Sequence, residues 1–406
     1  MSDTTEEKLA KLVTLFPDYE KEALLDILVS CNGSIREVTL LIDGDYSKLK
    51  EIESQRKRLK TKSQQTLLSC FSSPSSAISA RTLPRGSNGK PINLYTKSEI
   101  ESSLRYCTYH PNIFPDQLAD SLLKMGLEDD AAAPNEFYLF GNKCVSNHKT
   151  RIYSNQPNGS SMNYNGKKVK NVGAYTDELA MAQVIIEETV NTALGKRKVL
   201  PFQVKPGDWN VQTVLCNIYG RESNLDWHSD RLTHIGAHAV IASVSLGFSR
   251  EFRVRKVYPT NSQVYSIHPS HNSLIIMHAG FQEEYKHCVP FLPKRRAIPA
   301  DEIHPLSGTS RVNLTYRNYT MSQNPTCEKC GYPMELRRAF KDSKNRGKYL
   351  WQCAKSYTDQ NGFKEGNECR GMRFARLNCD PPYTNDERLC STWLADDDYE
   401  AKQIQQ

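Results

Sequence analysis

A histidine and an aspartate one residue apart, His228 and Asp230, are the side chains in this sequence best suited to metal chemistry. In an extended segment, side chains two positions apart point to the same face, so both could reach one ion. With a second histidine from a later strand they would form a two-histidine, one-carboxylate triad. Such a triad is typical of non-haem Fe(II) oxygenases and leaves metal positions open for a co-substrate and oxygen. Because an isolated His-x-Asp is more often part of a surface loop, the rest of the chain must support this interpretation.

The second histidine is expected from a strand that returns to the same site. His287 lies in an apolar run that favours a strand, and we expect it to be the third iron ligand. His278 is the alternative, although it precedes Ala279-Gly280, a turn-like setting. Two other histidines are too close to the first ligand along the chain and are expected to be structural: His234 and His238.

An Fe(II) oxygenase of this kind also needs a cation for the distal carboxylate of 2-oxoglutarate. Arg311 and Arg317 lie six residues apart in a strand-like run, so they share a face and could supply it. Upstream, Asn217 and Tyr219 are two residues apart and could form hydrogen bonds to the co-substrate. Taken alone, the two arginines would be ordinary surface charges of a strand.

The ordered set of these motifs resembles the AlkB family of dioxygenases over roughly residues 110–319. The matching segments are Asn217-x-Tyr219, His228-x-Asp230, Ser243-Val244-Ser245-Leu246-Gly247, His287 and Arg311-x-Asn313-x-Thr315-x-Arg317. The resemblance implies that Fe(II), 2-oxoglutarate and molecular oxygen are used to remove alkyl groups from nucleic-acid bases. It also adds Asn313 to the cofactor-binding residues. One departure puts the choice of base or substrate in doubt, because Arg231 follows where these enzymes carry an acidic residue.

Four cysteines near the C-terminus have the spacing of a zinc site: Cys327, Cys330, Cys353 and Cys369. Cys379 and Cys390 are alternatives to Cys369. The surrounding residues 346–353 and 369–374 resemble a GRF-type zinc finger, which implies binding to single-stranded nucleic acid. Basic residues interleaved with Tyr349, Trp351 and Phe374 fit that role. The alternative is a purely structural zinc module with these aromatic residues in its core.

The first 50 residues show three short helical patterns that resemble a CUE domain, a small ubiquitin-binding bundle. The residues that carry the resemblance are Leu15-Phe16-Pro17, Gly33 and Leu40-Leu41. It implies that ubiquitin contacts Phe16, Pro17, Leu40 and Leu41. The alternative is that these apolar residues simply close the bundle.

Residues 56–91 are rich in Lys, Arg, Ser, Gly and Pro, which is typical of a flexible linker. The basic run Arg56–Lys60 indicates nuclear import, with the cytoplasm as a further location. The segment Gln65–Phe71 loosely resembles the box by which repair proteins bind a sliding clamp. No run of about 18 apolar residues occurs, so we expect no membrane span.

The expected architecture is therefore multidomain, in a chain of 406 residues with a net charge of +7. We expect an all-α three-helix bundle at 5–47, a linker at 48–92, a β-rich double-stranded β-helix (jelly roll) with flanking helices at 93–321, a zinc finger at 325–377 and an acidic tail at 378–406. The predicted function is repair by oxidative dealkylation of alkylated bases, with single-stranded DNA as the expected substrate and 2-oxoglutarate decarboxylation coupled to it. The alternatives are a demethylase or hydroxylase acting on RNA or protein, and a non-catalytic adaptor between ubiquitin and nucleic acid.

Overall fold

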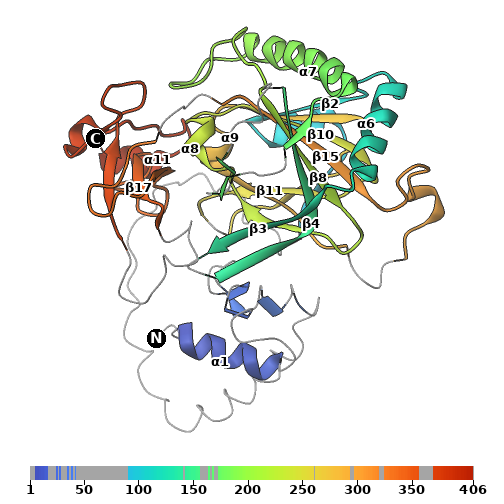
Figure 1. Cartoon of the computed structure of the whole chain (residues 1–406). Coiled ribbons are helices and arrows are strands. Elements are labelled where there is room, and N and C mark those ends of the chain that lie inside the picture. The colour runs from blue at the N-terminus through green and yellow to red at the C-terminus, as the bar shows by residue number, and fades with distance from the viewer. Residues whose placement is uncertain are drawn as a thin grey trace, which may run out of the picture. The chain divides into compact units, whose positions relative to one another are not determined.

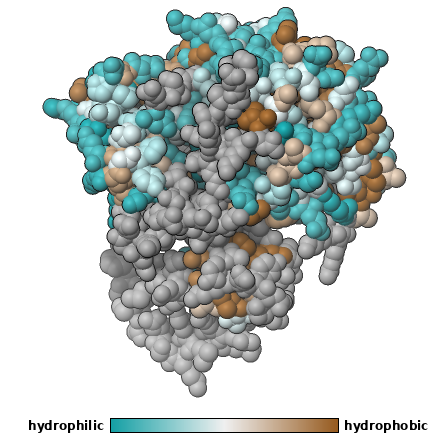
Figure 2. All heavy atoms as spheres, in the orientation of Figure 1, coloured by the Kyte–Doolittle hydropathy of each residue, from teal (hydrophilic) through white to brown (hydrophobic). Residues whose placement is uncertain are grey.

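The protein is described by a computed structural model that divides the chain into two compact units, Met1–Arg85 and Gly86–Gln406. The structure describes residues 5–16, 24–25, 27–28, 34–35, 38–39, 42, 90–139, 142–155, 163–164, 167–168, 172–259, 261–292, 297–319, 324–355 and 369–405. No helix within these ranges is long and apolar enough to cross a membrane. On the face drawn in Figure 2, the coloured surface of the second unit is mostly hydrophilic, with apolar residues in small separate groups.

The first unit contains helix α1 (Thr5–Leu15) and a small apolar core. The buried members of that core are Leu9, Leu12, Leu15, Phe16, Leu24, Leu28 and Val38. Phe16 is only 5% exposed and its ring packs in this core, so its contact with ubiquitin stays a prediction. Pro17, Leu40 and Leu41 lie outside the described residues, as do Arg56–Lys60 and the clamp-like box Gln65–Phe71.

Two β-sheets form the larger part of the second unit. The five-stranded sheet has the order β1 (Ile92–Leu94), β12 (Tyr265–Ile267), β11 (Phe252–Lys256), β14 (Tyr285–Val289) and β9 (Leu225–His228). The eight-stranded sheet has the order β2 (Cys107–Pro111), β13 (Ser273–Met277), β10 (Ile241–Gly247), β15 (Arg311–Arg317), β8 (Thr213–Tyr219), β4 (Asn142–Ser154) and β3 (Ala133–Leu139), with β7 (Val172–Ala174) beside β4. A two-stranded ribbon is made by β5 (Asn163–Tyr164) and β6 (Lys167–Lys168).

The two sheets share one apolar core, as a jelly roll requires. Buried residues of the five-stranded sheet, such as Val254 and Ile267, pack in the same cluster as Ile241 and Ile275 of the eight-stranded sheet. The jelly roll predicted from the sequence is therefore confirmed. It brings strands far apart in the sequence side by side, including β9 and β14, which carry the predicted metal ligands.

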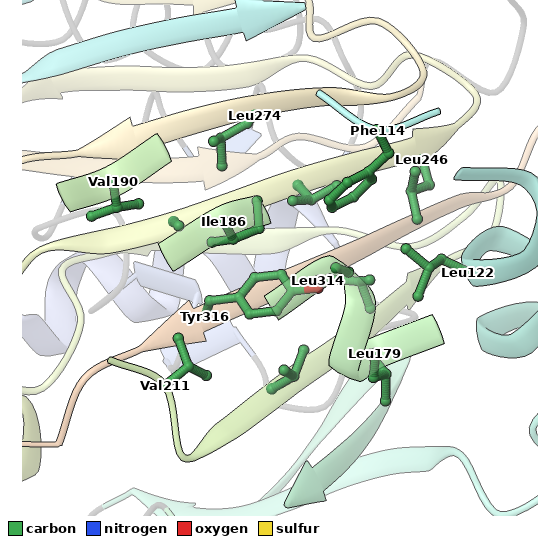
Figure 3. Packing of buried hydrophobic residues seen from close by; sticks show 14 of the residues in the cluster. Phe114, Leu122, Leu179, Ile186, Val190, Val211, Leu246, Leu274, Leu314 and Tyr316 are labelled. Atoms are coloured by element: carbon green, nitrogen blue, oxygen red, sulfur yellow. The ribbon is translucent and has the colours of Figure 1, made fainter. Parts of the chain in front are cut away.

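Long helices cover the outer face of the eight-stranded sheet. Helices α6 (Asp116–Glu128) and α7 (Asp177–Gly195) lie over it in Figure 1, and their buried residues pack with strand residues such as Leu246, Leu274 and Leu314 in Figure 3. Helix α5 (Lys97–Ser103) begins with a Thr96 capping box. The chain then enters strand β2, which pairs with β13.

A separate four-stranded sheet ends the chain, in the order β16 (Met334–Arg338), β17 (Tyr349–Cys353), β18 (Met372–Ala375) and β19 (Tyr383–Thr384). The short helix η2 (Glu387–Leu389) and helix α11 (Tyr399–Gln405) follow. Because β19 pairs with β18, the segment expected as an acidic tail is part of this folded region. We call residues 324–405 the cysteine module.

Candidate functional site

The structure brings His228, Asp230 and His287 together. The two histidines lie opposite each other on neighbouring strands β9 and β14, and Asp230 follows two residues after the first. Asp230 Oδ1 is 3.6 Å from His228 Nε2 and 3.8 Å from His287 Nε2. All three donor atoms lie within 4.8 Å of one another, a spacing that suits one shared metal ion.

The other histidines weighed from the sequence lie elsewhere. His278 Nε2 is 2.9 Å from Thr108 Oγ1, in a buried position apart from the cluster. His238 is also buried, and its ring contacts the carbonyl of Pro201. The return strand thus supplies His287, as its apolar surroundings predict.

Charges around the cluster favour the protonation states that a metal ion needs. Burial tends to raise the pKa of Asp230, but Arg317 and the two imidazoles outweigh it and the pKa falls to about 2. Burial lowers the pKa of His287 to about 3, and the nearby His228 adds to the effect. At neutral pH the site therefore offers an ionised carboxylate and a neutral His287 imidazole.

Neighbouring groups hold the ligands in place. His228 Nδ1 lies 2.7 Å from the Asp226 carbonyl, which leaves Nε2 to face the other ligands. The backbone N–H of Asp230 donates to Gln282 Oε1 at 2.8 Å, and the Ser229 hydroxyl donates to the Tyr285 carbonyl. Gln282 was not predicted from the sequence, because no spacing rule relates it to the His-x-Asp segment.

Arg311 is a buried cation on β15, the strand that carries the predicted arginines for 2-oxoglutarate. It is 1% exposed, donates to Ser245 Oγ at 2.8 Å, and lies 5.6 Å from the centre of the Tyr219 ring, its neighbour across β15 and β8. Its Nε has no protein partner, and the described residues place no carboxylate against it. Burial lowers its pKa to about 10, which still leaves it charged. Such a guanidinium fits the carboxylate of a bound dicarboxylic acid.

Two of the predicted co-substrate residues have other contacts. Arg317 binds Asp230, with Nη2 2.6 Å and Nε 2.7 Å from Oδ2, so it supports a metal ligand and does not share a site with Arg311. The amide of Asn313 donates to Ser243 Oγ and the Val244 carbonyl. Asn313 thus joins two strands, and its role as a cofactor ligand stays a prediction. Asn217 is buried directly across from it on β8.

The four predicted cysteines form a second cluster. Sγ of Cys327 is 3.5 Å from that of Cys369, and Sγ of Cys330 is 3.4 Å from that of Cys353. Tetrahedral zinc with thiolate bonds of about 2.3 Å needs sulfur atoms only slightly farther apart, so the set fits Zn(II). A Cβ at Gly371 would overlap the Cys327 sulfur. The alternatives, Cys379 and Cys390, lie outside the cluster.

The aromatic residues of the cysteine module correct one part of the nucleic-acid prediction. Tyr349 and Trp351 are fully buried, and both belong to the core that surrounds the cysteines. They cannot stack on bases. Phe374 is only partly buried and keeps an accessible edge.

A protein-family model agrees with this geometry. The model of the 2OG-Fe(II) oxygenase superfamily matches residues 106–317, a segment that contains every residue of the His–Asp–His cluster and Arg311. The chain belongs to the 2OG-Fe(II) oxygenase superfamily. Family membership implies Fe(II), 2-oxoglutarate and oxygen, and the ionised Asp230, neutral His287 and unpaired Arg311 Nε fit those groups.

Within this superfamily, the chain is similar to curated relatives named alpha-ketoglutarate-dependent dioxygenase alkB homolog 3. The human protein is 35% identical over 113 residues, which are 26% of this chain and 35% of that protein. The mouse protein is 36% identical over a segment of the same length, also 35% of its chain. The chain thus spans about a third of the length of these relatives.

Likenesses to solved structures are weaker. A 2OG-Fe(II) oxygenase family oxidoreductase from Burkholderia pseudomallei has a TM-score of 0.36 and 12% identity, covering 56% of this chain and 94% of that one. A prolyl-4-hydroxylase from Pseudomonas putida has a TM-score of 0.34 and 12% identity, covering 54% and 96%.

Proposed function

We propose that this oxygenase removes alkyl groups from nucleic-acid bases, with single-stranded DNA as the preferred substrate. The observation that carries the proposal is that one jelly roll contains both the His228–Asp230–His287 cluster and a buried Arg311 whose Nε has no partner. An adaptor would have no use for either. The relatives named as alkB homologs support a base dealkylase over other members of the superfamily.

Each residue then has a distinct task. His228, Asp230 and His287 would hold Fe(II), and Arg317 keeps Asp230 ionised and oriented through two short hydrogen bonds. Arg311 binds the distal carboxylate of 2-oxoglutarate. Bound Fe(II) and 2-oxoglutarate would supply oxygen activation, in which decarboxylation of 2-oxoglutarate to succinate and carbon dioxide is coupled to hydroxylation of the N-alkyl carbon and its loss as an aldehyde.

A cluster of cations supports a polyanionic substrate. Arg255 on β11 lies directly across from Lys286 on β14, the strand that also carries His287. The pKa of Lys286 is lowered, first by burial and then by the positive charges of Arg255 and Lys341. The guanidinium of Arg255 also lies 4.7 Å from the Trp227 ring centre. Positive charge beside the strand that carries His287 favours a negatively charged substrate such as nucleic acid.

The N-terminal unit has a proposed partner on the resemblance of its sequence alone. We propose that it binds ubiquitin through Pro17, Leu40 and Leu41. Titration calorimetry of ubiquitin with the full chain and with Leu40→Asp tests this. Equal affinities for the two proteins would refute the assignment.

A product assay by mass spectrometry tests the catalytic proposal. Single-stranded DNA and RNA oligonucleotides with 1-methyladenine or 3-methylcytosine are incubated with the full chain, Fe(II), ascorbate and 2-oxoglutarate. We expect loss of one methyl group that requires 2-oxoglutarate and is absent from His228→Ala. His304→Ala, a histidine substitution in a loop outside the cluster, serves as the matched control and should retain activity.

Three other outcomes are informative. If RNA reacted faster than DNA, the proposed dealkylation would stand, but the preferred substrate would be RNA. Turnover of 2-oxoglutarate without reaction of any oligonucleotide would reject the nucleic-acid substrate and favour a protein. If the folded chain neither demethylated an oligonucleotide nor turned over 2-oxoglutarate, the enzyme assignment would be rejected and the non-catalytic adaptor favoured.

A further inference from the structure

The cysteine module packs against both segments that carry the metal ligands. Helix α8 (Leu232–Ile235) starts two residues after Asp230, and helix α9 (Phe281–Glu284) leads directly into β14 and His287. Strand β16 of the module lies against α8, and Figure 1 shows α8 and α9 on the side of the catalytic sheets that faces the module.

At α8, the contact combines an ion pair with apolar packing. Arg231 Nη1 is 2.9 Å from Glu335 Oε1 on β16, and the Glu335 side chain is only 9% exposed. Leu232 is buried in the core of the module with Met334 and Tyr349. Arg231 is the residue adjacent to Asp230, so this contact acts one peptide bond away from a metal ligand.

At α9, the contact uses buried polar groups. Arg338 on β16 donates to the Glu283 carbonyl at 2.8 Å and lies 3.2 Å from the Glu284 carboxylate. The Tyr349 hydroxyl donates to Glu283 Oε1 at 3.4 Å. The residue before Glu283 is Gln282, whose side chain accepts the N–H of Asp230. The module therefore reaches the same aspartate from two directions.

We propose that the cysteine module positions the iron ligands, with Arg231 and Arg338 as positioning residues. The side chain of Arg231 turns toward Glu335, which explains why the position after the His-x-Asp segment is basic. Zn(II) bound by the four cysteines would organise β16 and β17, and these strands contact α8 and α9. The proposal rests on the proposed function for the identity of the site as an iron site, but not on any particular substrate.

Binding of Mn(II), a stand-in for Fe(II) that prefers oxygen and nitrogen ligands, tests the proposal. Titration calorimetry with saturating 2-oxoglutarate would compare the full chain with Glu335→Gln. Direct partners of metal ligands change metal affinity by about 10- to 100-fold; because Glu335 acts on Asp230 only through Arg231, we expect a loss at the lower end, about tenfold. Glu387→Gln is the matched control: it removes another ion pair of the module, with Lys348, on a side chain that is 56% exposed. It should leave Mn(II) affinity unchanged.

Hydrogen exchange separates positioning from unfolding. In Glu335→Gln, amides in peptides covering 229–235 should exchange faster, while those of β17 and the zinc content should stay as in the wild type. The exchanged pair Arg231→Glu with Glu335→Arg should restore Mn(II) affinity. If Glu335→Gln left both the Mn(II) affinity and the hydrogen exchange of peptides 229–235 unchanged, the proposal would be overturned. It would also be overturned if the double variant with the swapped charges restored neither the Mn(II) affinity nor the slow hydrogen exchange. Neither readout uses an alkylated substrate, so failure of the dealkylation assay would leave this test intact.

Discussion

Arg311 illustrates how a single side chain can indicate a missing anion. A buried guanidinium without a carboxylate costs free energy unless an anion binds it. Its hydrogen bond to Ser245 satisfies one donor and leaves Nε unpaired. By contrast, Arg317 has its anion in Asp230. The two arginines are therefore not interchangeable, although the sequence places them in one motif.

Arg311→Gln should raise the KM for 2-oxoglutarate about 10- to 100-fold, because a hydrogen bond to a charged group contributes about 1.5–3 kcal/mol. Arg311→Lys keeps the positive charge but loses the planar guanidinium. Its KM for 2-oxoglutarate should lie between those of the wild type and Arg311→Gln. The measurement is succinate formation at varied 2-oxoglutarate. Arg253→Gln removes a partly exposed arginine paired with Glu251 and should leave the KM for 2-oxoglutarate unchanged. Equal KM values in folded Arg311→Gln and wild type would contradict the assignment.

His278 should make stability depend on pH. Burial lowers its pKa from 6.5 to about 3, so the unfolded chain takes up a proton first as the pH falls. Stability is then lost below about pH 6.5, by up to about 1.4 kcal/mol for each pH unit until about pH 3. His278→Gln should show a shallower loss of unfolding free energy between pH 6.5 and 5, measured by urea titration with tryptophan fluorescence. Between pH 7 and 8 the two slopes should agree. Parallel curves down to pH 5 would refute the prediction.

Helices and strands can be predicted from the sequence where a short run of residues carries the pattern. Arg311 and Arg317 lie in one strand, β15, as the strand-like run around them predicts. Helix α7 was not predicted, because Met181 and Val184 lie on its exposed face and blur the contrast between its two sides. Likewise, Gln282 and Glu335 reach the site only through tertiary contacts, which no spacing in the sequence records.

Helix α7 allows a matched test of the outer core. Ile186 is fully buried against the sheet, whereas Val184, two residues earlier, is 65% exposed. Ile186→Ala should lower the free energy of unfolding by about 2–5 kcal/mol. Val184→Ala should change it by less than about 0.5 kcal/mol. Urea titration followed by tryptophan fluorescence measures both, since all four tryptophans belong to the unit Gly86–Gln406. Similar losses in the two variants would place α7 off the sheet.

At the scale of the whole unit, the last segment of the chain fastens the cysteine module to the catalytic sheets. Trp393 packs edge-on against His238, with ring centres 4.5 Å apart, and Arg338 lies over its ring. Farther on, Asp396 is paired with Arg105 at 2.6 Å, but these side chains are 75% and 47% exposed. Packing of the indole should therefore outweigh the exposed ion pair in holding the module.

Trp393→Ala should lower the free energy of unfolding by about 2 kcal/mol, less than the loss of a fully buried tryptophan because its ring is only partly covered. Arg105→Gln should cost at most about 1 kcal/mol. Urea titration gives both values, and limited proteolysis between the catalytic sheets and the module shows whether the two separate. Faster cleavage is expected for Trp393→Ala alone. If Arg105→Gln had the larger effect on either measurement, the module would be held by surface charge, and its attachment would weaken with added salt.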